Sequence, residues 1–217
     1  MSTMLSTPKV NIKELKNTLR LQFRSRRETM SRRKKKLWDT SIAHNLFRLN
    51  EYQSCTTVFA YVSKDIEVST AAILQRAWRD GKRVAVPLCV KGTYQMEFYY
   101  IQSERDLEKG TFGVMEPVPQ RCEQVTDLTH GFCVVPGLGF DARGFRLGYG
   151  KGYYDRFLSN FQGFTVGICY TSCIQWNLPH GYYDRPVDVL VTENYIRRTD
   201  GTVQERRLPC ANNARRG

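Results

Sequence analysis

Apolar residues at the start of the chain recur at the spacing of one helix face. Intervals of three or four positions predict a helix over residues 9–27. The apolar positions that set this spacing are Ile12, Leu15, Leu19 and Phe23. Ser31 can then cap a second helix, whose apolar positions continue to Leu49.

Farther along, short apolar runs rich in β-branched and aromatic residues alternate with helical patterns. Ser69 can cap a helix that ends before Gly81, and residues 153–161 form another. Residues 103–109 predict a short helix or turn, residues 111–131 a loop-rich region, and Pro87 the end of a strand or a bulge. Strands are predicted at 56–63, 83–90, 96–101, 132–135, 164–170 and 187–191.

This alternation of helices and buried strands favours an α/β fold. We expect a single domain with a largely parallel, covered sheet flanked by helices, in a Rossmann-like three-layer arrangement. The expected divisions are a flexible N-terminus over 1–8, the domain over 9–196 and an Arg-rich polar tail over 197–217.

Composition narrows the class of protein. A chain of 217 residues with 41% hydrophobic residues can bury a core. No apolar run approaches the ~18 residues of a membrane span, so no membrane partner is expected. The seven cysteines are an odd number without a Cys-x-x-Cys pair, which favours reduced thiols and a cytoplasmic protein. An Arg-rich mitochondrial transit peptide is the alternative interpretation of the N-terminus.

The net charge of +12 is concentrated at the two ends of the chain. Residues 1–36 carry +10 and residues 197–217 carry +4, whereas the segment between them carries −2. A near-neutral body argues against a continuous nucleic-acid groove. The basic run at 32–36 is interpreted as a solvated helix start that attracts anionic ligands, with a nuclear signal or RNA patch as the alternative.

The most informative segment spans residues 141–155, with the sequence DARGFRLGYGKGYYD. Alternating glycines allow close backbone approach and direct several N–H groups at one anion. Arg146 and Lys151 add cations suited to phosphate, and Asp155 can hold a divalent metal ion. The spacing fits neither the P-loop nor the dinucleotide-binding fingerprint. A tight strand–helix turn is the simpler alternative, but it needs neither the cations nor the two tyrosines.

The motif PGLGFD at 136–141, followed by the glycine segment, resembles the signature of the 5-formyltetrahydrofolate cyclo-ligase family, also called methenyltetrahydrofolate synthetase. Three further patches are similar in order along residues 16–192. They are Lys16 with Leu19-Arg20, Tyr61-Val62-Ser63 with Glu67 and Thr70, and Pro186-Val187-Asp188. The sequence departs from the family at 130–132, where His-Gly-Phe replaces the usual acidic residue.

The resemblance implies that ATP and Mg²⁺ drive closure of 5-formyltetrahydrofolate to 5,10-methenyltetrahydrofolate, with release of ADP and phosphate. Phosphorylation of the formyl oxygen would create the leaving group. The implied substrates are ATP and a reduced formyl-folate, with or without a polyglutamate tail. No nucleic-acid partner is expected, and nothing in the sequence requires more than a monomer.

The same resemblance implies residue roles. Lys151, Arg146 and Tyr153 would be catalytic. Lys16 and Arg20 lie one helical turn apart, so both can face one anion; surface cations are the alternative. The residues implied to bind ATP are Lys16, Arg20, Arg146, Leu147, Gly148, Tyr149, Gly150, Lys151, Gly152, Tyr153 and Tyr154.

Asp155 and Asp188 would hold Mg²⁺; the alternatives are an ion pair between Asp155 and Lys151, and an Asp188 that caps a strand. The residues implied to bind folate are Val62, Glu67, Phe112, Tyr153 and Tyr154. Two other functions remain open from the residues alone. They are an ATP-dependent ligase or kinase with another small substrate, and a basic RNA-binding protein.

Overall fold

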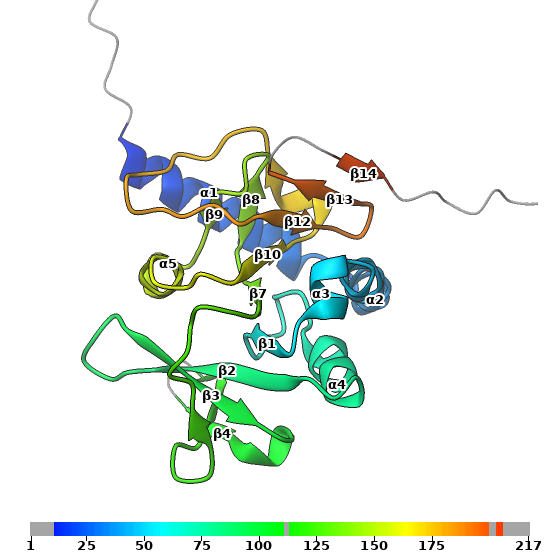
Figure 1. Ribbon diagram of the computed structural model, residues 1–217. Helices are drawn as coiled ribbons and strands as arrows, with labels where there is room; N and C mark the ends of the chain where they lie inside the picture. Colours follow the sequence, from blue (N-terminus) through cyan, green and yellow to red (C-terminus); the bar gives the residue numbers. More distant parts are fainter. Residues whose placement is uncertain (1–10, 111–112, 200–202, 206–217) are drawn as a thin grey trace, which may run out of the picture.

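The computed structural model describes residues 11–110, 113–199 and 203–205, and its arrangement is shown in Figure 1. A single large sheet crosses the molecule with helices on both faces. The helices are α1 (Ile12–Glu28), α2 (Arg32–Phe47), α3 (Asn50–Ser54), α4 (Ala71–Arg79) and α5 (Tyr153–Leu158), with 3-10 turns η1 (Glu104–Asp106) and η3 (Thr171–Cys173).

The main sheet has nine strands in the order β14-β13-β12-β10-β7-β1-β2-β3-β6. The five strands from β12 to β2 run parallel, and the strands at both edges are antiparallel. The α/β prediction is confirmed, with the parallel part confined to the centre. The strands are β1 (Thr57–Ala60), β2 (Arg83–Cys89), β3 (Met96–Ile101), β6 (Glu123–Gln124), β7 (Phe132–Val135), β10 (Phe164–Ile168), β12 (Val189–Val191), β13 (Tyr195–Arg198) and β14 (Val203–Glu205).

Successive residues of the central strands belong to two separate hydrophobic cores. In β1, Val58 and Ala60 pack with one cluster and Phe59 with the other. This alternation follows from the two-residue period of a strand. The first cluster includes buried residues of α2, α3 and α4, and the second includes residues of α1 and α5. The predicted three layers are therefore present.

Helix boundaries follow the local capping chemistry. Ser31 caps α2 as predicted, since its hydroxyl accepts the Lys34 N–H at 3.3 Å. The prediction for α4 was wrong by one residue, because Thr70 precedes the helix. The Thr70 hydroxyl instead donates to the Tyr61 carbonyl at 2.7 Å and ties the helix to the end of β1. In α1, Ile12 is 55% exposed, so its first turn extends beyond the core.

Besides β6, two short strands occur where the sequence predicted a turn and loop. They are β4 (Leu107–Lys109) and β5 (Met115–Pro117), which pair antiparallel. Pro87 lies within β2, beyond the residues of β2 that pair with β1. The absent N–H of proline is tolerated there because that side of β2 has no ladder to complete.

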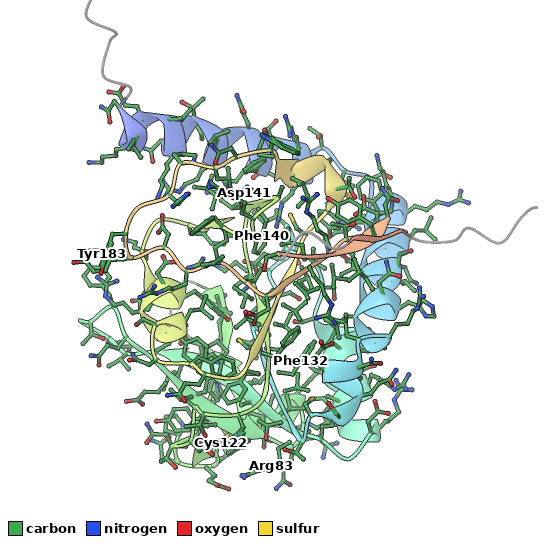
Figure 2. The ribbon with its side chains drawn as sticks, turned by 45° about the horizontal axis from the view of Figure 1, so that its top comes forward. Arg83, Cys122, Phe132, Phe140, Asp141 and Tyr183 are labelled. Atoms are coloured by element: carbon green, nitrogen blue, oxygen red, sulfur yellow. The ribbon has the colours of Figure 1, made fainter. Side chains whose placement is uncertain are left out.

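A small sheet beside the main one carries the glycine segment. Its strands are β11 (Ile174–Gln175), β8 (Gly139–Asp141) and β9 (Arg146–Leu147), in the order β11-β8-β9. Asp141 is fully buried and accepts N–H groups from Arg143, Phe145 and Leu178 at 2.9–3.0 Å. Figure 2 shows Asp141 and Phe140 inside the molecule, whereas Tyr183 lies at its edge. The buried carboxylate thus fixes the turn from which β9 emerges.

The sheet extends past the predicted domain boundary at residue 196. β13 continues to Arg198, whose guanidinium pairs with Glu51 at 2.7 Å, and the backbone of β14 pairs with β13. These strands therefore belong to the domain rather than to a polar tail. The predicted flexible N-terminus, and the tail from residue 206 onward, lie outside the described residues.

Among the described helices, none combines the length and the apolar composition that crossing a membrane requires.

Gly144 tests the packing of the turn between β8 and β9. Its φ is +87°, and an added Cβ would lie 2.6 Å from both Thr199 Cγ2 and the Val187 carbonyl oxygen. Gly81 has φ +71° with nothing within 4 Å, so Gly81→Ala is the matched control. We expect backbone strain of about 1 kcal/mol in both variants. Overpacking should add about 1–3 kcal/mol in Gly144→Ala alone. Denaturant unfolding measures the free energy of unfolding of both variants. An equal loss of stability in the two would contradict the prediction.

Candidate active site

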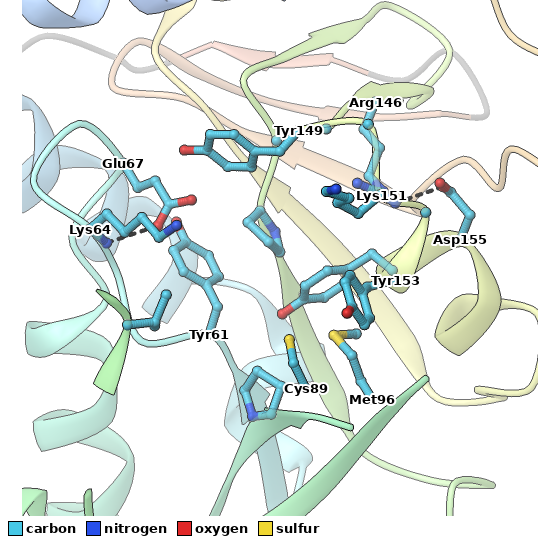
Figure 3. Close-up of a pocket in the computed structure, with 18 of the residues that line it drawn as sticks. Tyr61, Lys64, Glu67, Cys89, Met96, Arg146, Tyr149, Lys151, Tyr153 and Asp155 are labelled. Atoms are coloured by element: carbon cyan, nitrogen blue, oxygen red, sulfur yellow. Dashed lines mark hydrogen bonds and ion pairs between the residues drawn. The ribbon is translucent and has the colours of Figure 1, made fainter. Parts of the chain in front are cut away.

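A cavity of about 470 Å³ opens at the carboxyl ends of the central parallel strands. Tyr61 and Val62 follow β1 directly and line it, as do Pro136 and Gly137 after β7. Connections at this edge of a parallel sheet converge because the strand directions agree, which makes it the usual ligand site of open α/β folds. Figure 3 shows side chains from separate loops meeting around one cavity.

The glycine loop forms one wall of this cavity. It runs from β9 to α5 and contains Gly150 at φ +95° and Gly152 at φ +73°, conformations that glycine adopts without strain. An added Cβ on Gly148 would meet the Arg146 guanidinium at 2.6 Å. Because α5 has only six residues, the dipole expected to favour anions is short, and the cations carry most of that role.

Four cations line this wall, and they come from two distant parts of the chain. Arg20 Nε donates to the Gly148 carbonyl at 2.9 Å, so α1 contacts the loop directly. Lys16 Nζ lies 2.8 Å from Asp184 Oδ2, and Arg146 Nη2 lies 2.6 Å from Asp155 Oδ1. Lys151 forms no ion pair with any described residue. This wall is therefore rich in donors directed at one space.

Arg146 is the most buried of these cations. Its side chain is 6% exposed, and its Nε is buried without a hydrogen-bond partner among the described residues. The guanidinium also lies 5.4 Å from the centre of the Tyr154 ring. A buried donor without a partner is rare in folded proteins, and an anionic ligand would satisfy it.

Ionisation of the neighbouring groups follows their surroundings. Burial by itself raises the pKa of Asp184, but hydrogen bonds from Lys16 and Gly181, with the charges of Lys16 and Arg146, hold this pKa below its ordinary value overall. Burial lowers the pKa of Arg20, an effect that Asp184 opposes. A partly desolvated guanidinium gains from an added anion.

The opposite side of the cavity is aromatic and contains Glu67 beside Lys64. Glu67 is 7% exposed, and its Oε2 accepts the Lys64 N–H at 2.8 Å. Burial, followed by the charge of Glu67, raises the pKa of Tyr149, so its hydroxyl stays protonated. Figure 3 shows Tyr61, Glu67 and Tyr149 across the cavity from Arg146 and Asp155. This side suits a flat, polar-edged ring that can donate N–H groups to a carboxylate.

Comparisons with known proteins show the family of this chain. The model of the 5-formyltetrahydrofolate cyclo-ligase family matches residues 12–193. The chain belongs to this family. It is 32% identical over 172 residues to a Schizosaccharomyces pombe protein named probable 5-formyltetrahydrofolate cyclo-ligase, covering 72% of this chain and 84% of that protein. The Haemophilus influenzae 5-formyltetrahydrofolate cyclo-ligase is 29% identical over 179 residues, covering 80% and 95%.

The solved structures include a similar fold. The NMR structure of Aquifex aeolicus 5,10-methenyltetrahydrofolate synthetase has 33% sequence identity and a TM-score of 0.75, covering 92% of this chain and 99% of that one. The resemblance to the cyclo-ligase family drawn from the sequence motifs is confirmed.

The cavity of this cyclo-ligase family member gathers most of the side chains singled out in the sequence. Helix α1, the loop after β1, the glycine loop and α5 supply them. Tyr153 reaches the far rim, where its hydroxyl donates to the Thr93 carbonyl at 3.1 Å. The predicted residues that line the cavity are Lys16, Arg20, Val62, Glu67, Arg146, Leu147, Gly148, Tyr149, Gly150, Lys151, Gly152, Tyr153, Tyr154 and Asp155.

Among the predicted residues that the structure describes, Asp188 is not brought to the cavity. Asp188 is exposed at the beginning of β12, and the amino ends of the parallel strands lie at the edge of the sheet opposite the cavity. Its Oδ2 accepts the N–H and the hydroxyl of Thr165 at 2.8 and 2.7 Å. Pairing of Asp188 with Asp155 at one metal ion is therefore corrected to a strand-capping role for Asp188. Phe112 lies outside the described residues.

Sequence reasoning missed several lining residues because their distance along the chain gives no local signal. The most consequential is Asp184, which approaches Lys16 from the segment before β12. Glu116 of β5 is a buried acid in the same cavity, where it faces Cys89. Burial, followed by the charge of Glu116, raises the pKa of the Cys89 thiol to about 11, so it is not a thiolate nucleophile at neutral pH.

The acids present fit a magnesium ion held together with a nucleotide. The described residues contain no group of three or more His, Cys, Asp or Glu side chains that would enclose a metal ion. Magnesium in nucleotide sites needs only one or two carboxylates, since phosphate oxygens and water complete its octahedron. Asp155 and Asp184, both in the cavity lining, meet that requirement.

The ion pair between Lys16 and Asp184 predicts a change in ionisation. Lys16→Met should raise the pKa of Asp184. The hydrogen bond and charge of Lys16, which lower this pKa, are then absent, whereas burial still raises it. In the unaltered protein this folded-state pKa lies below the unfolded value of about 3.9. Ionised Asp184 therefore stabilises the fold above pH ~4, and that contribution is lost as the pH falls through the folded-state pKa.

Carboxyl-carbon NMR titration measures this shift. The control is Lys13→Met, which removes an exposed cation of α1 outside the cavity. An unchanged Asp184 titration in Lys16→Met would show that the ion pair has no influence in solution.

Proposed function

We propose that this protein catalyses the ATP- and Mg²⁺-dependent closure of 5-formyltetrahydrofolate to 5,10-methenyltetrahydrofolate, with release of ADP and phosphate. The observation that carries the proposal is a single cavity with a glycine-and-cation wall facing a buried acid and aromatic rings. Such a cavity holds a polyphosphate and a pterin side by side. Membership of the cyclo-ligase family supports the same reaction.

The chemistry requires these two substrates to lie together. The formyl oxygen is a poor leaving group until the γ-phosphoryl group of ATP is transferred to it. Nitrogen N10 then attacks the formyl carbon and gives up its proton, the carbon–oxygen bond breaks, and phosphate departs. Phosphoryl transfer depends mainly on positioning and on compensation of the phosphate charge.

The cation wall, formed by the glycine loop with Lys16, Arg20, Arg146 and Lys151, supplies both the positioning and the charge compensation. Arg146 and Lys151, with the N–H groups of the loop from Leu147 to Gly152, would hold the terminal phosphates. Lys16 and Arg20 would add charge from α1, which already contacts Gly148. Tyr153 would complete the catalytic group by placing the formyl end of the folate beside the phosphates.

The opposite wall would bind the pterin. Glu67 would accept N–H groups from its polar edge, Val62 would contact its face, and Tyr153 and Tyr154 would pack beside it. The Tyr154 hydroxyl is buried without a partner among the described residues, so a ligand atom there would satisfy it. Phe112 is also proposed as a folate contact.

Asp155 would hold magnesium at the phosphate end of the cavity. The ion supplies charge neutralisation of the phosphate oxygens when it is bound. In this structure Asp155 instead engages Arg146, so its carboxylate already faces the cation wall.

We also propose that the protein acts in the cytoplasm as a monomer with no nucleic-acid partner. The six described cysteines are free thiols, in agreement with a reducing compartment. Size-exclusion chromatography and localisation of a tagged chain test these points, and a mitochondrial location is the alternative that the second measurement would reveal.

An absorbance assay tests the reaction. The protein is incubated with MgATP and 5-formyltetrahydrofolate, and the methenyl product is followed by its absorbance together with release of ADP. Both should appear in equal amounts. ATP hydrolysis only with other small acids or formamides would favour a different ligase or kinase, and RNA binding without ATP hydrolysis would favour a basic binding protein.

Lys151 should be essential for turnover. Lys151→Ala removes a loop cation with no ion pair among the described residues, so its charge is free to act on phosphate. We expect kcat/KM to fall about 100-fold or more, as when one preorganised donor to a transition state is removed. Lys36→Ala, on the exposed face of α2, is the control for net charge. Comparable activity of the two variants would exclude Lys151 from the phosphate site.

A substitution at Glu67 should weaken the binding of the folate substrate but not the binding of ATP. Glu67→Gln keeps the shape and one oxygen acceptor but removes the charge opposite the cation wall. We expect KM for 5-formyltetrahydrofolate to rise about tenfold while KM for ATP stays within about twofold, since one charged hydrogen bond is lost at the pterin. Steady-state kinetics with each substrate varied in turn measures this. An equal rise in both constants would place Glu67 outside the pterin site.

A further inference from the structure

The cation wall is partly neutralised by its own acids in the ligand-free protein. Lys16 pairs with Asp184 at 2.8 Å, and Arg146 pairs with Asp155 at 2.6 Å. Arg20 and Lys151, in contrast, form no ion pair with an acid among the described residues, although the charge of Asp184 acts on Arg20. Two of the four cations proposed to hold phosphate are therefore occupied before a nucleotide arrives.

Asp184 is held in this position by two donors on one oxygen. Its Oδ2 accepts both Lys16 Nζ and the Gly181 N–H at 2.8 Å, whereas no described residue donates to Oδ1. The residues just before it, Tyr182 and Tyr183, are 87% and 79% exposed. Asp184 is thus the point where an exposed segment is tied to α1, and one of its oxygens is available for a ligand.

A nucleotide without a metal ion meets two obstacles here. Its phosphates must displace a carboxylate from Lys16, and they are repelled by the carboxylates that remain nearby. Both obstacles would be removed if the carboxylates of Asp155 and Asp184 held a divalent cation that also attracts the phosphates. Lys16 and Arg146 would then be released to the phosphate oxygens.

We propose that Asp184 is a positioning residue with two states, one that holds Lys16 in the free protein and one that joins Asp155 at the magnesium ion of the bound nucleotide. Through this exchange, magnesium and nucleotide strengthen each other's binding at the cation wall. The inference rests on the proposed function.

Calorimetric titration with ADP tests the exchange, in EDTA and in magnesium. Asp184→Asn keeps an oxygen that can accept the Gly181 N–H but loses the charge on Lys16. We expect metal-free ADP to bind this variant about three- to fivefold more tightly than the unaltered protein, the equivalent of one partly exposed ion pair. The gain in affinity caused by magnesium should fall by about tenfold.

Two controls isolate the cause. Asp65→Asn makes the same charge change at an exposed position outside the cavity lining, and should match the unaltered protein. In a Lys16→Ala background, Asp184→Asn should improve metal-free binding by a smaller factor, because relief of the repulsion between Asp184 and the phosphates remains but no Lys16 is left to release. Thermal unfolding of each variant confirms that the fold is intact.

The outcomes are distinct. If Asp184→Asn binds metal-free ADP no better than Asp65→Asn, or loses affinity with and without magnesium alike, Asp184 only anchors its segment and the exchange is wrong. The proposed function would survive that result. If the unaltered protein binds no ADP under either condition, the proposed function and this inference both fail.

Discussion

A buried cation near the end of α1 holds the walls of the cavity together. Arg27 is 5% exposed, and its Nη2 donates to the carbonyls of Gly137 and Leu138 at 2.6 and 2.8 Å. Its Nη1 donates to the Ile66 carbonyl at 3.3 Å. These carbonyls belong to the connections that follow β7 and β1, the two segments that line the cavity floor. Charged donors form the stronger class of hydrogen bonds, so one side chain fixes both connections relative to α1.

The helix face of α1 that carries Arg27 also reaches the cation wall. Lys16, Arg20, Phe23 and Arg27 are spaced at the i, i+4, i+7 and i+11 positions of one face. Phe23 is fully buried between the cations, so it sets the depth of α1 against the second core cluster. Arg20 can therefore reach the Gly148 carbonyl only because Arg27 and Phe23 place the helix. The cation wall is therefore assembled by the packing of α1 as much as by the glycine loop.

Features that depend on local sequence were predictable, and those that depend on topology were not. The glycine loop, its cations and the capping by Ser31 follow from neighbouring residues, and the structure has them where the sequence placed them. Asp188 and Asp184 lie four residues apart, but only the turn before β12 decides which one reaches the carboxyl edge of the sheet. The role of Arg27 could not be predicted for the same reason. Its partners are backbone carbonyls distant in the sequence, which no pattern of side chains indicates.

Charge within the cavity is mixed rather than simply positive. The lining contains five cations and four acids, although the whole chain carries +12. Figure 3 shows Arg146 and Lys151 with Asp155 on one side, and Glu67 with Lys64 on the other. The cations outnumber the acids beside the glycine loop, so the phosphates of one substrate would bind there, and the ring N–H groups of the other would bind at Glu67. The excess positive charge lies in the terminal segments, where it can raise the rate of capture of anionic substrates without neutralising the acid that orients them.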